Sequence, residues 1–228
     1  MTDAPARPRL AALYHHSELI VVILLGLVSV ETAYTSFQSS LYGGQSANRI
    51  AQAGASETAA ESLYLEGNQQ YVQDTAVVLQ LAQLKLDTQS ADATVAADAQ
   101  AKYDELKFIG VSDALGVAIT SAEALDKTET DVYHDPQDDE AYQNSLFSAY
   151  DEEHAKSLAL KAEGDSYNDR GDLLGFTTAL MAITLFLLGV AAVVRRERTR
   201  LTLTVIGMVI FTGTAILTAT VPFTWIGS

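Results

Sequence analysis

The feature that most constrains this chain is a pair of long uncharged apolar runs separated by only six residues. The runs cover residues 173–194 and 201–223, and the connector between them, residues 195–200, reads Arg-Arg-Glu-Arg-Thr-Arg. Each run is long enough to cross the hydrocarbon core of a bilayer as a helix. Because so short a connector must turn the chain back on itself, the two runs predict an antiparallel transmembrane hairpin.

A third apolar run, from Leu19 to Val30, follows a basic segment that contains Arg7 and Arg9. A short apolar run behind positive charges is also typical of a secretory signal peptide. No small-x-small cleavage site follows this run, so we expect an uncleaved signal anchor. Its 12 residues would cover only about 18 Å of the roughly 30 Å of hydrocarbon. The predicted span therefore continues to residue 36.

The arginines predict the orientation of these spans. Arg7 and Arg9 precede the first span, and four arginines occupy the connector between the other two. Positively charged residues remain on the cytoplasmic side, so both segments are predicted to be cytoplasmic in the plasma membrane. The predicted order is a cytoplasmic N-terminus (1–18), a first span (19–36), an outer domain (37–172), a second span (173–194), a cytoplasmic turn (195–200), a third span (201–223) and an outer tail (224–228).

The predicted outer domain is strongly acidic. Residues 37–172 hold 8 lysines and arginines against 25 aspartates and glutamates. Such a segment lacks the basic side chains that neutralise phosphates, which excludes nucleic acid as a partner. The acidity fits either a saline habitat or cation binding. The chain has no cysteine, which excludes disulfides, thiolate catalysis and cysteine-based metal sites.

The outer domain is predicted to be helical throughout. Its N-terminal part has no proline up to Leu86, and its larger apolar residues recur at spacings near three and four. We expect a connection over residues 87–97, shorter helices over 103–109 and 111–125, and an acidic loop over 131–140. The larger apolar residues of the N-terminal part are Leu63, Tyr64, Tyr71, Val78, Leu81 and Leu84.

A last long helix is predicted to continue into the second span, with Tyr142, Leu146, Tyr150, His154 and Leu158 on one face. The expected fold class is therefore all-α. Three transmembrane helices would carry an extracytoplasmic helical hairpin or bundle, formed by extensions of the first and second spans.

The segment after the first span contains Gln38-Ser39, Tyr42-Gly43-Gly44, an Ala51–Ala55 stretch reading AQAGA, and Asn68–Gln70. It resembles the corresponding segment of a family of uncharacterised small prokaryotic three-span membrane proteins. The paired C-terminal spans with an arginine-rich turn are also similar, whereas residues 87–135 depart from the family pattern. Because the function of that family is unknown, the resemblance implies the topology and no activity.

Glu31 and the threonines of the third span form a candidate polar site within the membrane. An ionisable residue in a span is costly unless it faces protein or water, and hydroxyls can line a wet pore. The competing interpretation puts Glu31 at the headgroups and uses the threonines for close helix packing. The residues of this candidate site are Glu31, Thr212, Thr214 and Thr218.

The acidic loop is a second candidate site, for a weakly bound divalent cation. Its oxygen and nitrogen donors do not follow the spacing of an EF-hand, and a solvated loop is the competing interpretation. The candidate ligands are Asp131, His134, Asp135, Asp138 and Asp139. No catalytic or nucleotide-binding motif occurs, so we expect no enzyme activity and no cofactor.

These observations predict a non-enzymatic membrane scaffold or interaction protein that self-associates through its spans and its helical ectodomain. Its expected partners are the lipid bilayer and either further copies of itself or another membrane protein. Two alternatives remain open. One is a homo-oligomeric ion channel, and the other is an extracytoplasmic sensor or an accessory subunit of a larger membrane complex.

Overall fold

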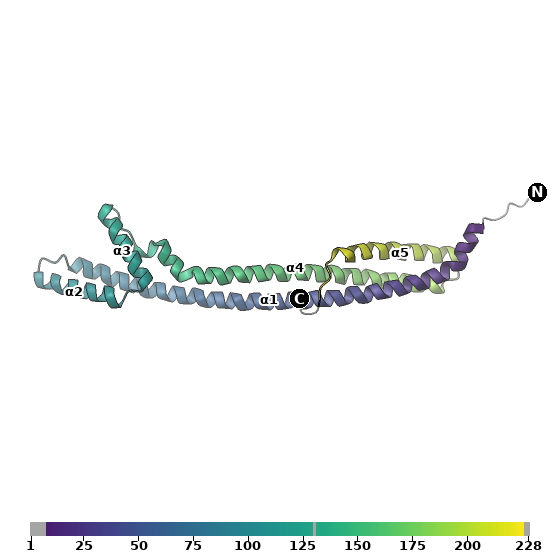
Figure 1. Ribbon diagram of the computed structural model, residues 1–228, viewed down its shortest axis with the longest axis horizontal. Helices are drawn as coiled ribbons and strands as arrows, with labels where there is room; N and C mark the ends of the chain where they lie inside the picture. Colours follow the sequence, from purple (N-terminus) through teal and green to yellow (C-terminus); the bar gives the residue numbers. More distant parts are fainter. Residues whose placement is uncertain (1–7, 130, 226–228) are drawn as a thin grey trace, which may run out of the picture. The chain divides into compact units, whose positions relative to one another are not determined.

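The computed structural model describes residues 8–129 and 131–225, and its side chains are described from Leu19 onward. In these residues the chain is all-helical, without a strand. The five α-helices are α1 (Pro8–Asp87), α2 (Ala93–Ile109), α3 (Asp113–Thr128), α4 (Glu140–Val193) and α5 (Glu197–Thr220), and a short 3₁₀ helix, η1 (Pro136–Asp138), precedes α4. Figure 1 shows these helices in sequence colours.

Three of the helices, α1, α4 and α5, are each long and apolar enough to cross a membrane. This result agrees with the number of spans that the sequence predicts. The chain divides into two compact units. We call Met1–Ala51 with Leu160–Ser228 the span unit, and Gln52–Ala159 the central unit.

In the span unit, α1, α4 and α5 lie side by side (Figure 1). The buried residues of α1 and α4 recur at spacings of three and four, or of seven, as in a coiled-coil seam. They are Val21, Leu24, Val28, Thr35, Gln38 and Tyr42 on α1, and Leu174, Thr177, Met181, Thr184, Leu188 and Ala191 on α4. The seam is therefore apolar over one part of its length and rich in hydroxyl and amide groups over the other.

The central unit has its own apolar core. Leu115 and Ile119 of α3 pack with Leu81 of α1 and Tyr142 of α4. Tyr103 of α2 packs against this cluster. One face of α3 therefore joins the pair of long helices in this unit.

The helix ends follow local capping chemistry and refine the predicted boundaries. Asp92 caps α2, accepting a hydrogen bond from the Thr94 amide at 2.8 Å, so α2 begins within the connection predicted over 87–97. The predicted break near Gly110 is confirmed. At the C-terminal side, α5 begins at Glu197 and ends at Thr220, before Pro222, which cannot continue a helical hydrogen-bond ladder.

Candidate functional site

The best-defined polar contacts of the span unit join α1 to the segment after α5. The buried Gln38 side chain pairs with the backbone of Thr224, donating to its carbonyl at 3.2 Å and accepting from its amide at 3.1 Å. The Tyr42 hydroxyl donates to the Pro222 carbonyl at 2.6 Å. The Gln45 amide donates to the Thr224 hydroxyl at 2.8 Å. We call Gln38, Tyr42 and Gln45, together with the Pro222 and Thr224 groups that they bond to, the tail clamp. Its hydrogen bonds satisfy backbone polar groups of the non-helical segment after α5.

Aromatic rings surround the tail clamp. Phe223 stacks on Tyr34 with ring centroids 6.4 Å apart, and Trp225 meets the edge of Phe223 at 4.8 Å. Tyrosine and tryptophan are enriched where a protein crosses from hydrocarbon to water. The cluster is therefore suited to a membrane interface.

The helices α1 and α4 approach each other closely beside the tail clamp. The Ser39 hydroxyl donates to the Gly171 carbonyl at 2.8 Å, and the hydroxyls of Thr178 and Thr35 are 2.9 Å apart. A Cβ placed on Gly171 would lie 3.4 Å from the Tyr42 Cβ. Small residues at helix interfaces allow this close approach.

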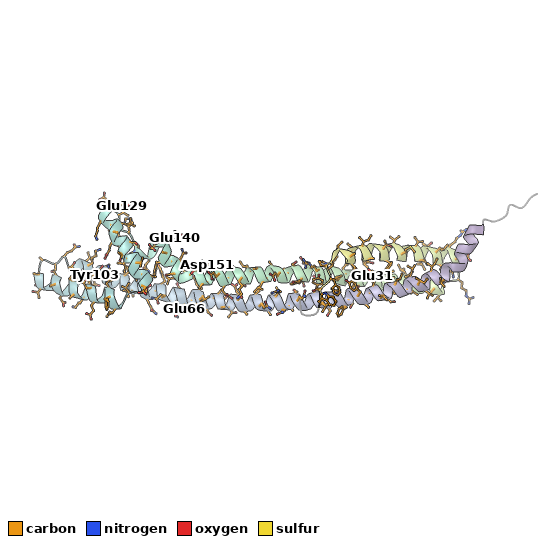
Figure 2. All side chains as sticks on the ribbon, in the orientation of Figure 1. Glu31, Glu66, Tyr103, Glu129, Glu140 and Asp151 are labelled. Atoms are coloured by element: carbon orange, nitrogen blue, oxygen red, sulfur yellow. The ribbon has the colours of Figure 1, made fainter. Side chains whose placement is uncertain are left out.

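Glu31 and the threonines predicted as an intramembrane site are not brought together by hydrogen bonds. Glu31 is half-buried on α1 (Figure 2) and has no hydrogen-bond or ion-pair partner among the described residues. Thr212 is exposed and bonds to the Met208 carbonyl of its own helix. Thr214 is buried and bonds to carbonyls of α5 and to the sulfur of Met181 on α4.

Thr218 is the third threonine of this predicted site. Its hydroxyl is buried and has no hydrogen-bond partner in the described part of the chain. The hydroxyls of Thr212 and Thr214 therefore bond to backbone of their own helix, and that of Thr214 also to Met181.

Two of the acidic-loop residues act as helix caps. Asp135 accepts from the Gln137 amide at the start of η1, and Asp139 accepts from the Tyr142 amide at the start of α4. Asp131 and Asp138 are exposed. Within residues 19–129 and 131–225, no group of three or more histidines, aspartates or glutamates is arranged to hold a metal ion.

His134, the remaining loop residue, instead faces carboxylates of the neighbouring helix and turn. Its Nδ1 lies 2.9 Å from the Asp126 carboxylate, which also accepts from the His134 backbone amide. Its Nε2 lies 3.5 Å from Glu129. Hydrogen bonds from His134 hold the pKa of the Asp126 carboxyl below its ordinary value. His134 thus ties the loop to α3.

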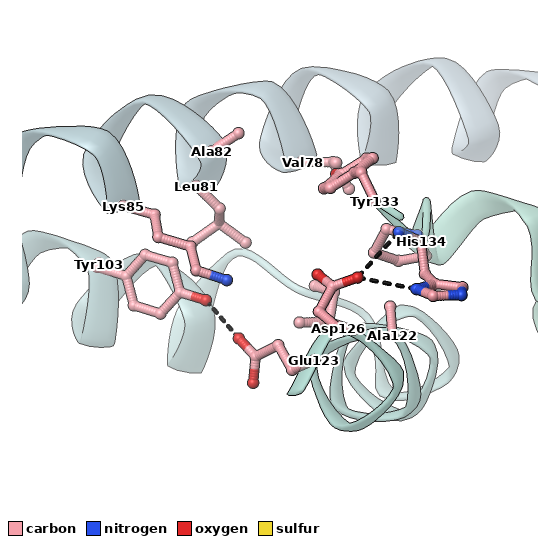
Figure 3. A pocket seen from close by; sticks show the side chains of 12 residues that line it. Val78, Leu81, Ala82, Lys85, Tyr103, Ala122, Glu123, Asp126, Tyr133 and His134 are labelled. Carbon is pink, nitrogen blue, oxygen red and sulfur yellow. Dashed lines mark hydrogen bonds and ion pairs between the residues drawn. The ribbon is translucent and has the colours of Figure 1, made fainter. Parts of the chain in front are cut away.

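A pocket of about 70 Å³ lies beside this pair in the central unit (Figure 3). Apolar side chains form much of its wall, and charged groups from α1 and α3 reach it. Lys85 extends toward the pocket from α1, while Glu123 and Asp126 approach it from α3 (Figure 3). The apolar lining comprises Val78, Leu81, Ala82, Ile119, Ala122 and Pro136.

Glu123 is a charged group of the pocket that accepts hydrogen bonds from two other side chains. It accepts a hydrogen bond from the Tyr103 hydroxyl at 2.7 Å and from the Lys107 ammonium at 3.1 Å. Burial raises the pKa of the Glu123 carboxyl, but these two hydrogen bonds, together with the charges of Lys107 and Lys85, outweigh burial and hold the pKa below its ordinary value. Burial, reinforced by the bond to Glu123, raises the pKa of the Tyr103 hydroxyl. The pocket therefore presents ionised carboxylates opposite a lysine, which suits a small zwitterion or cation.

A buried carboxylate stabilises the core beside the pocket. Asp74 accepts from the buried Tyr142 hydroxyl at 2.9 Å and from the Gln70 amide at 2.8 Å. Burial, together with the bond to Asp74, raises the pKa of the Tyr142 hydroxyl. The Gln137 side chain donates to the Thr75 hydroxyl at 2.9 Å. Each buried polar group in this network has a partner, as native cores require.

Sequence reasoning missed both the tail clamp and the Tyr103–Glu123 pair. A signal for the clamp existed, because Gln38 and Tyr42 continue the spacing of the apolar residues Val21, Leu24 and Val28 on α1. The pair had no local signal, since its members belong to different helices.

No protein-family model, curated protein or solved structure matches this chain. Over the residues that the structure describes, the fold defines an all-helical class of protein with three helices long and apolar enough to span a membrane.

Proposed function

We propose that this chain is a non-enzymatic integral protein of the plasma membrane that self-associates and acts as a scaffold or interaction module. In this proposal the N-terminus and the connector at residues 195–200 are cytoplasmic, and the central unit is extracytoplasmic. The four arginines of the connector support the orientation. The unbroken helices α1 and α4, which extend beyond their apolar segments, support an outer hairpin built from the first two spans.

One observation carries the scaffold proposal: the central unit exposes large apolar side chains on helices that are otherwise polar and acidic. Phe108 is 88% exposed and Ile109 is 70% exposed at the end of α2. Other exposed members are Leu65, Val72, Leu79 and Leu86 on α1. Apolar surface that remains uncovered in a water-facing domain marks a site of protein contact when it is contiguous or ordered.

The mass of the complex purified in nanodiscs tests this proposal. We expect a defined assembly of two or more copies, reproduced by chemical crosslinking in native membranes before any detergent is added. A monomer in both experiments, with no other protein attached, would exclude the scaffold function.

The orientation needs a separate test, and the absence of native cysteine makes it simple. Cysteines introduced at Thr88 and at Arg198 are treated with a membrane-impermeant maleimide in intact cells. We expect Thr88→Cys to be labelled directly and Arg198→Cys only after the membrane is permeabilised. The reverse pattern would invert the proposed topology.

A second candidate function is extracytoplasmic sensing, alone or as an accessory subunit, and the charged pocket of Figure 3 favours it. Small amino acids and polyamines carry the charges that Glu123, Asp126 and Lys85 would complement. Binding of such a ligand is expected to slow hydrogen exchange in α3, and Glu123→Gln should abolish that protection. The channel hypothesis has less support, because the bonded hydroxyls of Thr212 and Thr214 are engaged with their own helix.

A further inference from the structure

In the central unit, α1 carries a regular stripe of apolar side chains on its exposed surface. Leu65, Val72, Leu79 and Leu86 follow one another at intervals of seven residues, and their exposed fractions are 60%, 60%, 66% and 69%. We call these four residues the α1 stripe.

The α1 stripe lies opposite the face that packs inside the unit. The packed face has the same period, with Gly67, Asp74 and Leu81 buried. Leu65, Val72 and Leu79 each precede one of these buried residues by two positions. A step of two positions turns the side chain by about 200° around the helix axis, so the stripe points away from that core. The α1 helix therefore presents two seams in this region, of which the structure fills only one.

The seven-residue spacing of the α1 stripe indicates the kind of helix that could pack on it. Apolar residues that recur every 3.5 positions remain on the side of a partner helix when two helices supercoil left-handedly. The positions four residues after Leu65, Val72 and Leu79 would complete the seam, and all three are exposed. They are Gln69, Ala76 and Gln83. The small or uncharged character of these residues permits close pairing without burying a charge.

The distribution of charge indicates which partner would bind to this seam. From Gly67 to Leu84 the only charged residue is Asp74, which is 2% exposed and points into the core. The 37–172 segment as a whole carries 25 acidic residues against 8 basic ones, so two copies repel each other across most other surfaces. A basic partner would bind those acidic surfaces instead. An uncharged apolar seam is complementary to an identical seam.

We propose that the α1 stripe pairs with the α1 stripe of a second copy as a parallel, in-register coiled coil. This inference rests on the proposed function, because two copies inserted in the membrane with the same topology must run their α1 helices in the same direction. Stable interfaces in solution bury about 800 Å² per partner, and four apolar side chains provide less than that. The pairing therefore depends on anchoring in a shared membrane, which raises the effective concentration.

A cysteine scan of the full-length protein in native membranes tests this pairing. Single cysteines replace Leu65, Val72 and Leu79 of the stripe, and matched controls replace the exposed residues that follow each one, Glu66, Gln73 and Gln80. Facing residues of a parallel pair place their Cα atoms within the roughly 4.4–6.8 Å that a disulfide needs. After mild oxidation we expect about five-fold more disulfide-linked dimer at each stripe position than at its control.

Any other pattern of dimer yields over these positions contradicts the proposed pairing. Equal yields at stripe and control positions would indicate random collision. A yield confined to one stripe position would indicate antiparallel crossing, and no dimer at any position would indicate no pairing. A double variant, Val72→Glu with Leu79→Glu, should abolish lysine crosslinking of copies, while Gln73→Glu with Gln80→Glu should retain it.

The failure of this inference can be distinguished from failure of the proposed function. An impermeant maleimide added to intact cells should label Gln73→Cys, which is exposed and lies outside the proposed seam. Labelling without the periodic disulfide pattern would remove the coiled coil and leave the membrane scaffold in place. Absence of labelling in intact cells, with labelling after permeabilisation, would show that the proposed orientation is wrong.

Discussion

The span unit and the central unit pair the same two helices with the same spacing of buried residues, but they use different chemistry. In the span unit the seam passes from Val28 and Leu188 to Thr35, Gln38 and Ser39. The hydroxyls of Thr35 and Ser39 form hydrogen bonds with α4, and the Gln38 amide bonds to the segment after α5. In the central unit buried polar contacts also join α1 and α4, from Tyr142 to Asp74 and from Ser157 to the Ala53 carbonyl. There, however, a further helix, α3, adds an apolar core and contributes most of its buried residues.

The difference follows from the solvent of each unit under the proposed topology. Lipid tails are as apolar as leucine, so helices in a membrane gain little by burying apolar side chains and associate through close packing and hydrogen bonds. In water, apolar burial drives folding. The two units should therefore respond differently to the same kind of substitution.

The largest expected effect is in the core of the central unit. Leu115 is fully buried, and Leu115→Ala should reduce the free energy of opening this unit by about 2–5 kcal/mol. Hydrogen exchange measured by mass spectrometry should rise in peptides from α3 and remain unchanged in those from α5. The control is Val117→Ala on the same helix, because Val117 is 63% exposed. Equal effects of the two variants would show that α3 does not pack through Leu115.

Each unit has a glycine at a place where two helices approach closely. A Cβ on Gly67 would lie 2.6 Å from the Leu146 carbonyl oxygen, whereas one on Gly164 would lie 2.8 Å from the terminal Cδ1 of Ile50. A backbone atom cannot move aside, but an isoleucine methyl group can rotate. Gly67→Ala should therefore destabilise the central unit by about 1–3 kcal/mol, as overpacking does.

Gly164→Ala should be nearly neutral, because alanine also favours the helix by up to about 1 kcal/mol over glycine. Thermal unfolding in nanodiscs, followed by circular dichroism, measures both variants. If Gly164→Ala proved the more damaging change, the close approach in the span unit would be the stricter one.

The tail clamp gives the largest expected effect in the span unit. Gln38→Leu removes both hydrogen bonds to Thr224 and leaves buried backbone groups without partners, at a cost of about 1–3 kcal/mol. Trp225 is the single tryptophan of the chain, so its fluorescence anisotropy reports on release of the segment. We expect a clear drop in anisotropy for Gln38→Leu and none for Ser40→Ala, an exposed site on the same helix.

Much of the helical architecture could be predicted from the sequence, and the reason is local. The uncharged runs and their arginine connector predict the helical hairpin by composition alone. The helices predicted over 103–109 and 111–125 leave a break at Gly110, a residue of low helix propensity. The structure agrees with the all-helical class, with three helices suited to a membrane, and with the break near Gly110.

The contacts could not be predicted in the same way, because they depend on three-dimensional placement. The sequence groups His134 with nearby acids of its loop, but its ring lies against Asp126 and Glu129, which precede the loop. Tyr103 meets Glu123 on another helix. A pattern of spacing identifies a helix face, but it does not identify which residue of a second helix will meet that face.

Acid should weaken the contacts of α3 in the central unit. Hydrogen bonds from Tyr103 and Lys107 depress the folded-state pKa of Glu123 despite burial. A depressed carboxyl pKa stabilises the fold fully above the unfolded value of about 4.3. This stabilisation is lost as the pH falls through the lower folded-state pKa. Near-UV circular dichroism of the tyrosines should show a transition below about pH 4 that Glu123→Gln shifts or removes. An unaltered acid transition in that variant would assign it to other carboxylates.

The smallest expected effect concerns the pair formed by His154 and Glu57, whose side chains lie 3.1 Å apart on α4 and α1 of the central unit. Both are about two-fifths exposed, at 36% and 41%, and exposed pairs contribute at most about 1 kcal/mol. His154 also stacks on Tyr150 with ring centroids 5.4 Å apart. His154→Phe should therefore retain the stacking and lose only the polar contact, while His154→Ala loses both. A double-mutant cycle with Glu57→Gln, followed by thermal unfolding, separates the two contributions. A coupling energy well above about 1 kcal/mol would mean that this exposed polar contact stabilises the central unit as strongly as a buried one, and would weaken the contrast between the units at this position.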